Sequence, residues 1–98
     1  MANLIITYWR DIPSAVSVKA GRTEEKRMLD NRFMEAIDMA AMRSGSTDTD
    51  SYLADWRRSA PAPVSDDLAA EADKAKAALE AEFTQEKIKA LIAAGGKA

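Results

Sequence analysis

Two short clusters of aromatic, guanidinium and carboxylate side chains carry the chemistry that this sequence offers most clearly. Trp9, Arg10 and Asp11 follow one another, and Trp56 and Arg57 form a second pair later in the chain. Trp and Arg are among the residue types most enriched at binding hot spots, and a guanidinium can stack on a flat ligand or hold an acidic group. These side chains are therefore the candidate interaction site. In the alternative reading both Trp side chains are core residues, because a small domain with few aromatics needs them for burial.

The residue types that the chain lacks limit its chemistry. It contains no Cys and no His among its 98 residues. Thiolate nucleophiles, disulfides, Cys-ligated metals and imidazole bases are therefore excluded. Carboxylates, amines, guanidinium groups and hydroxyls remain, but no Ser has a His partner and no carboxylate pair has an evident buried position. We expect no catalytic residue, no cofactor site and no metal site, and therefore a protein that is not an enzyme.

Charge and hydropathy narrow the range of partners. Lys and Arg number 14 and Asp and Glu number 16, which gives a formal net charge of -2. Because a nucleic-acid binder has a basic footprint, we expect no nucleic-acid partner. No segment approaches the roughly 20 apolar residues of a membrane span, and the opening "MANLIITYWR" has no basic start typical of a signal peptide. We expect a cytoplasmic protein with no membrane partner.

The first cluster lies at the end of a predicted β-hairpin. Residues 4–10 and 15–19 alternate in the manner of strands. Asp11, Pro13 and Ser14 between them are turn residues, so these residues need no other function. Trp9 and Arg10 do not serve the turn. At the strand's end they are expected to be displayed to solvent rather than buried.

The segments after the hairpin read as helical. Thr23 is a plausible N-cap for a helix over residues 23–43, in which apolar side chains recur on one face. That face carries Leu29, Phe33, Ala36, Ile37 and Ala40. A short helix over residues 49–58 would carry the second cluster. Exposed charges contribute roughly 0–1 kcal/mol to stability, so neither Arg10 nor Arg57 is expected to support the fold.

The C-terminal third reads as two helices. Apolar side chains of its first half line one face, and those after Phe83 fall nearly on the opposite side. Thr84 can be an N-cap with Phe83 and Ile88 flanking it as a hydrophobic staple, which predicts a break at this point. Gly95 and Gly96 are expected to end the last helix and begin a frayed tail.

Together these elements predict an α+β fold, with an N-terminal β-hairpin packed on an amphipathic helix, a short second helix and a C-terminal helical arm. The expected division is an α+β domain over residues 1–60, a Pro/Ala linker over 61–64 and a helical extension over 65–98. Two strands alone make a marginal sheet. We therefore expect either a short third strand or a partner at a sheet edge.

Two runs of this chain resemble a known family. They are "IITYWRDIPSAVSVKAGR" and "RFMEAIDMAAMRSGSTDTDSYLADWRR". They are similar to small bacterial proteins of the virulence factor domain family, in the free-standing form found in alphaproteobacteria, and the resemblance covers about residues 3–58. The family name reports a phenotype and implies no catalytic residue. Similar proteins occur beside genes of cobalamin-dependent methyl transfer and one-carbon metabolism, which implies an accessory role in such a system.

Two function classes follow from these observations. The first is a non-enzymatic accessory or adaptor protein of the cytoplasm, with a protein partner that the resemblance suggests is a corrinoid methyltransferase component. Self-association into a homo-oligomer is a further option for so small a core. The alternative is a small ligand-binding or enzyme subunit that uses Arg10, Asp11 and Arg57. Either class places the recognition chemistry on the two aromatic and guanidinium clusters.

Overall fold

An antiparallel sheet is the centre of the molecule in the computed structural model, which describes residues 2–45 and 49–97. Strand β1 is its middle strand, with β2 and then β3 on one side and both β4 and β5 on the other. The strands are β1 (Ala2–Trp9), β2 (Ile12–Ala20), β3 (Thr23–Met28), β4 (Trp56–Arg58) and β5 (Ala62–Val64). The α+β class predicted from the sequence is therefore confirmed.

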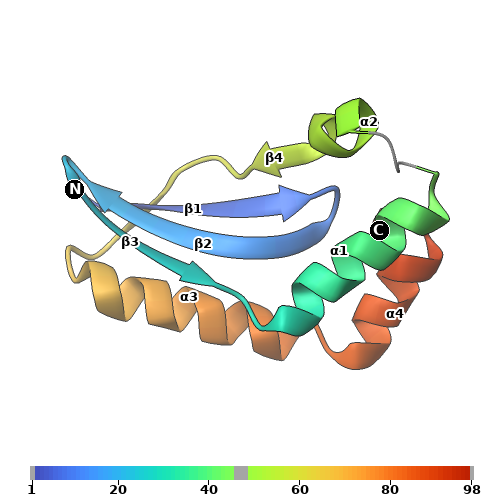
Figure 1. Cartoon of the computed structure of the whole chain (residues 1–98). Coiled ribbons are helices and arrows are strands. Elements are labelled where there is room, and N and C mark those ends of the chain that lie inside the picture. The colour runs from blue at the N-terminus through green and yellow to red at the C-terminus, as the bar shows by residue number, and fades with distance from the viewer. Residues whose placement is uncertain (1, 46–48, 98) are drawn as a thin grey trace.

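The helices gather on one face and at one end of this sheet. They are α1 (Asn31–Arg43), α2 (Thr49–Ala54), α3 (Leu68–Glu82) and α4 (Gln85–Ala93). Helix α3 runs along one face of the sheet, and α1 and α4 pack together beyond the end where β1 turns into β2 (Figure 1). Among residues 2–45 and 49–97, no helix covers most of the other face of the strands.

The predicted hairpin is confirmed, but its turn is tighter than expected. Only Arg10 and Asp11 separate the two strands, and Arg10 has a φ of 54°, in the left-handed region. The predicted turn residues Pro13 and Ser14 lie within β2, where the pairing shifts from Thr7↔Ala15 to Tyr8↔Pro13. This bulge suits a proline, because Pro cannot donate to a regular ladder.

The helix predicted over residues 23–43 is wrong for its first part. Residues 23–28 form β3, paired with β2 from Ala20↔Thr23 to Ala15↔Met28, and α1 begins only at Asn31. Gly21, with a φ of 60°, allows the tight turn that folds the chain back. The charged residues of β3 protect it as an edge strand. Of the two expectations, a third strand or a partner at a sheet edge, the structure shows the further strand: β3 extends the hairpin, and β4 and β5 add to the other side of β1.

The helix predicted over residues 49–58 ends at Ala54, and the segment predicted as a linker over 61–64 includes β5. Both β4 and β5 complete the second edge of β1. Between them Ser59 continues the ladder. The backbone N–H of Ile6 donates to Ser59 Oγ at 2.9 Å, and the Ser59 N–H donates to the Ile6 carbonyl at 2.8 Å. The second cluster therefore lies on a strand beside the first.

The core forms between the helices and the covered face of the sheet. The stripe predicted on α1 is confirmed, because Phe33, Ala36, Ile37 and Ala40 are all buried. Side chains from β1, β2, α3 and α4 join them. The main cluster includes Trp9, Ile12, Val16, Leu29, Phe33, Ile37, Leu79, Phe83, Ile88 and Leu91. The C-terminal helices therefore contribute to the same core as the strands.

The predicted break between the last two helices is confirmed. Helix α3 ends at Glu82, and Thr84 caps α4 by accepting the backbone N–H of Lys87 at 3.3 Å. Arg32 of α1 holds the end of α3 from outside, since its Nη1 donates to the Phe83 carbonyl at 2.6 Å and its Nη2 to the Glu80 carbonyl at 2.8 Å. The bend lets α4 pack against α1.

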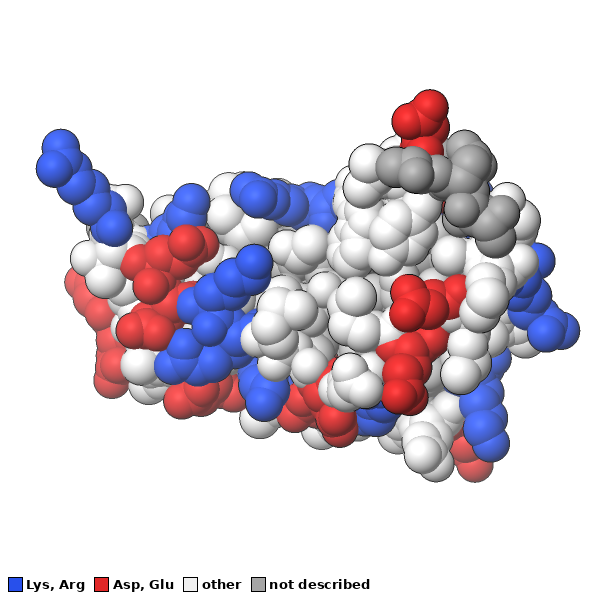
Figure 2. All heavy atoms as spheres, viewed as in Figure 1, with Lys and Arg blue, Asp and Glu red and all other residues white. Residues whose placement is uncertain are grey.

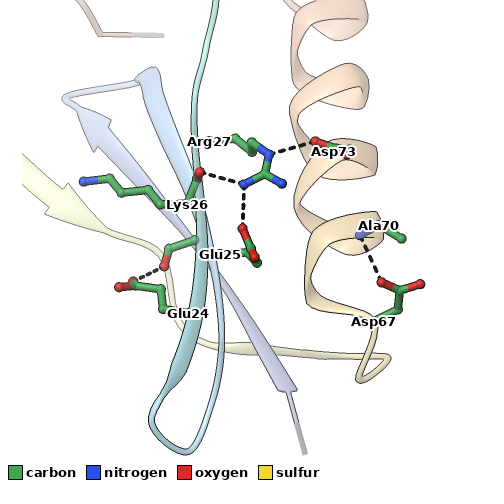
Figure 3. A network of polar contacts seen from close by, with 8 residues as sticks. Glu24, Glu25, Lys26, Arg27, Asp67, Ala70 and Asp73 are labelled. Atoms are coloured by element: carbon green, nitrogen blue, oxygen red, sulfur yellow. Dashed lines mark hydrogen bonds and ion pairs between the residues drawn. The ribbon is translucent and has the colours of Figure 1, made fainter.

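Charges of both signs are interspersed over the part of the surface around β2, β3 and α3 (Figure 2). One contact there joins the sheet edge to α3 (Figure 3). Arg27 of β3 pairs with Asp73 of α3 through its Nε at 2.9 Å, and with Glu25 through its Nη1 at 2.9 Å. Exposed pairs of this kind contribute about 0–1 kcal/mol each, so they orient α3 more than they stabilise it.

Candidate functional site

Trp9 is a core residue, and the expectation that it is displayed to solvent is wrong. Its side chain has no exposed surface. The indole Nε1 donates to the Tyr52 carbonyl at 2.9 Å, and the two rings stack with centroids 5.8 Å apart. The end of the hairpin is covered because α2 folds over it. The alternative reading of the sequence, in which this Trp serves burial, is correct for Trp9.

Arg10 is also turned into the structure, with only 14% of its side chain exposed. Its Nε pairs with Asp55 Oδ2 at 3.0 Å, and its Nη1 donates to the Gly95 carbonyl at 2.6 Å. The guanidinium lies 4.7 Å from the centroid of the Trp9 ring. Arg10 therefore links the hairpin to α2 and to the C-terminal segment. The expectation that it contributes nothing to the fold does not agree with these contacts.

The segment predicted as a frayed tail is packed. Gly95 and Gly96 are both buried, and the Gly96 carbonyl accepts the backbone N–H of Asp11 at 2.8 Å. Both glycines have positive φ, and a Cβ on Gly96 would lie 2.8 Å from the Trp9 ring. Glycine is required here because the backbone approaches the indole too closely for any side chain.

Of the two arginines in the predicted site, Arg57 is the one that remains accessible to solvent. Half of its side chain is exposed, at 51%. Its Nε donates to the Arg10 carbonyl at 2.8 Å, its Nη2 pairs with Asp11 Oδ1 at 3.1 Å, and its plane lies 4.5 Å from the Tyr8 ring centroid. Its Nη1 makes no hydrogen bond to any residue that the structure describes. Arg57 is thus held in one position with donors to spare.

A hollow of about 480 Å³ lies beside Arg57, between the end of the sheet and α4. We call it the Arg57 groove. Its lining residues are Tyr8, Asp11, Arg57, Ser59, Ala60, Phe83, Lys87 and Leu91. Lys87 provides a second cation, with its Nζ 4.4 Å from the Phe83 ring centroid and 3.7 Å from Glu82 Oε1. The groove therefore combines two cations with aromatic and aliphatic surface.

Tyr8 contributes a neutral hydroxyl to this groove. Burial raises the pKa of Tyr8, an effect that the Arg57 guanidinium opposes and that the carboxylates of Glu82 and Asp11 reinforce. A phenol with a raised pKa stays protonated near neutral pH. Tyr8 can therefore donate or accept a hydrogen bond there, but it does not supply a phenolate base.

The structure brings all the predicted site residues to one end of the sheet. Trp9 pairs with Trp56 across the β1–β4 ladder, and the half-buried Trp56 packs edge-on against Tyr52 with centroids 5.9 Å apart. Asp11 and Arg57 also line a second hollow of about 400 Å³. Two of the predicted residues are thus internal, and Asp11, Trp56 and Arg57 remain accessible.

Several groove residues were missed by sequence reasoning. Phe83, Lys87 and Leu91 belong to the C-terminal helices, far along the chain from Tyr8. The only local signal was the staple around Thr84, which predicted the bend that brings α4 here. Arg57 lies beside Tyr8 in the groove because β4 pairs with β1. Nothing in the local sequence predicts this pairing.

Within residues 2–45 and 49–97, no group of acidic side chains lies close enough together to hold a metal ion. No helix in that part of the chain is both long and apolar enough to cross a membrane. These observations concern the described residues only. The Arg57 groove adds aromatic and aliphatic surface to its charged groups and hydroxyls.

Comparison with known proteins identifies the family. Neither a curated protein nor a solved structure matches the chain significantly. The family model described as Virulence factor matches residues 7–92 of the 98. The match runs through both C-terminal helices, so the expectation that the resemblance ends near residue 58 is wrong. The matched span includes every residue of the Arg57 groove. The chain belongs to the Virulence factor family.

Proposed function

We propose that this protein is a non-enzymatic adaptor that binds a protein partner through the Arg57 groove. One observation carries the proposal: Arg57 is fixed by three contacts and still half exposed. An arginine that is ordered before binding loses little side-chain entropy on association. Arginine anchors of this kind are enriched at binding hot spots.

The rest of the groove suits a protein side chain. Leu91, Ala60 and Phe83 supply apolar surface, and Ser59 and Tyr8 supply hydroxyls. A central apolar pocket with a few polar groups at its edge is the usual composition of an interface hot spot. The volume of about 480 Å³ accommodates one or two large side chains of a partner, which would anchor a wider contact surface.

The family resemblance suggests the setting of this interaction. Relatives of the free-standing form occur beside genes of cobalamin-dependent methyl transfer and one-carbon metabolism. We therefore propose a corrinoid methyltransferase component of the cytoplasm as the partner. In this role the protein itself performs no reaction, and its residues serve recognition.

The test is co-purification from the native cells with a tagged chain and two groove variants, Arg57→Ala and Lys87→Ala. Arg22→Ala is the matched control, since Arg22 is exposed in the turn between β2 and β3. Truncating an anchor arginine costs about 2 kcal/mol or more, roughly a thirtyfold loss of affinity. We expect one stoichiometric protein with the wild type and the control, and its loss with Arg57→Ala. The free energy of unfolding of Arg57→Ala should fall by only about 0–1 kcal/mol, because the contacts of Arg57 are partly exposed. Retention of that protein by Arg57→Ala would contradict the proposal.

The volume of the Arg57 groove supports one rival, a ligand-binding subunit, because small-molecule pockets span about 300–1,000 Å³. In that case Asp11 and Arg57 would hold the ligand, while the Arg10 guanidinium is already engaged by Asp55 and Gly95. A purified protein without a partner but with a retained small molecule would favour this rival. A concentration-dependent mass would instead indicate self-association.

A further inference from the structure

A further hollow, of about 210 Å³, lies on the face of the sheet opposite α3. Its position follows from strand alternation. Leu4, Ile6 and Val16 face the core, so Ile5, Thr7 and Ser17 face the other side. The complete lining is Ile5, Thr7, Ser17, Lys19, Glu24, Lys26 and Arg58. We call this the open-face hollow, and it shares no residue with the Arg57 groove.

The edge strand shows the same division between two faces. In Figure 3, Arg27 points toward α3, where it meets Asp73, whereas Glu24 and Lys26 extend to the other side. Lys19 on β2 and Arg58 on β4 also line this side. Cations from three different strands therefore converge on one hollow.

The three cations of the open-face hollow are only partly compensated by negative charge. Lys19, Lys26 and Arg58 form no ion pair with any residue that the structure describes. Glu24 is the one carboxylate in the lining, and the Ser17 hydroxyl donates to it. That hydrogen bond is the largest effect and lowers the pKa of Glu24. Desolvation opposes it, and Lys19, Lys26 and Arg58 each lower the pKa further. With Glu24 ionised, three positive charges and one negative charge leave a net charge of +2.

We propose that the open-face hollow binds a small soluble molecule that carries a phosphate group with two or more negative charges, such as a phosphate monoester or pyrophosphate. A dianion would neutralise the net charge of the lining residues. Lys and Arg are the usual phosphate binders, and the Thr7 hydroxyl can donate a further hydrogen bond. No lining residue is aromatic, so the hollow offers no stacking surface for the bases of a single-stranded nucleic acid.

The test is a titration of the full chain with pyrophosphate at constant ionic strength, followed by calorimetry and by amide chemical shifts. Arg58→Gln and Lys26→Gln should each weaken binding by about tenfold, because each removes a charge within a few ångströms of the ligand. Lys74→Gln on α3 removes the same charge far from the hollow and should change the affinity by less than about twofold. Shift changes should centre on Ile5, Thr7 and Ser17.

A charge change of the opposite sign makes the test sharper. Glu24→Gln removes the built-in counter-charge, and it should tighten pyrophosphate binding several-fold. Glu86→Gln on α4 alters the net charge equally and should leave the affinity unchanged within about twofold. All of these side chains are exposed, so the variants are expected to fold.

Three results would overturn the proposal. The first is equal weakening by Lys74→Gln and Arg58→Gln, which would indicate a nonspecific charge effect. The second is an equal affinity for sulfate and for pyrophosphate, with amide chemical-shift changes spread over the whole surface. The third is an oligonucleotide that binds this face more tightly than pyrophosphate at the same ionic strength, which would identify a nucleic-acid surface instead.

Discussion

Gly96→Ala is the most informative single change for the packing of the C-terminal segment. A Cβ at this position would lie 2.8 Å from Cζ3 of Trp9 and 3.3 Å from Cδ of Arg10. Trp9 is fully buried, so its ring cannot move aside without disturbing its contacts with Tyr52 and the core. Either the indole or the C-terminal segment must therefore shift.

Two costs add in this variant. The φ of +91° at Gly96 is strained for Ala, by about 1–2 kcal/mol. Overpacking against a filled core adds about 1–3 kcal/mol. We expect Gly96→Ala to lower the free energy of unfolding by roughly 2–5 kcal/mol. In a domain this small that is a large part of the total stability.

Gly21→Ala is the matched control. Gly21 also has a positive φ, +60°, but no atom lies within 4 Å of its added Cβ. It should show the backbone strain alone, about 1–2 kcal/mol. Urea denaturation followed by Trp fluorescence, on a Trp56→Phe background so that Trp9 is the reporter, measures both variants with comparable m-values. If Gly96→Ala is no less stable than Gly21→Ala, the segment does not pack on Trp9 and the reasoning fails.

Three further predictions concern the core, a cap and a titration. Phe33→Ala should destabilise the fold by about 3–5 kcal/mol in urea melts, because Phe33 is fully buried, whereas the exposed Met42→Ala should cost less than about 0.5 kcal/mol. Thr84→Ala should cost about 0.5–2 kcal/mol through the lost cap of α4, and Thr84→Ser should restore most of it; equal melts for the two variants would argue against the cap. The pKa of Glu24 should lie below its ordinary 4.5 by carboxyl NMR and rise in Ser17→Ala. A lowered pKa adds stability above pH 4.5 that is lost as pH falls through the folded value, and an unchanged Glu24 pKa in Ser17→Ala would contradict the assigned hydrogen bond.

The parts of the fold with strong local signals could be predicted. The alternation in β1 and β2, the apolar stripe on α1 and the staple at Thr84 each depend on residues a few positions apart. Strand β3 could not be predicted, because the charged residues that follow Thr23 resemble the first turn of a helix. Pairing with β2 through the Gly21 turn overrode that local preference.

Two members of the Arg57 groove, Asp11 and Arg57, could be predicted from the sequence, but its other residues and their arrangement could not. Trp9 and Arg10 looked accessible because the partners that cover them are distant in sequence. Tyr52 lies 43 positions from Trp9, and Gly95 lies 85 positions from Arg10. Local reasoning cannot supply such contacts, since they follow from how α2 and the C-terminal segment close over the hairpin. The expectation that Arg57 is accessible was correct. Its groove could not be predicted, because Lys87 and Leu91 of α4 complete it and lie far from Arg57 in the sequence.

The adaptor proposal is tested most directly by photo-cross-linking from the Arg57 groove. Ala60 lines the groove and is exposed, so a benzophenone amino acid at this position should be tolerated. Ala69, exposed on α3, is the control position. We predict that the Ala60 probe captures one partner protein in native cells, that Arg57→Ala abolishes the capture, and that the Ala69 probe does not capture that partner. Capture of the same partner from Ala69 but not from Ala60 would contradict the assignment of this groove.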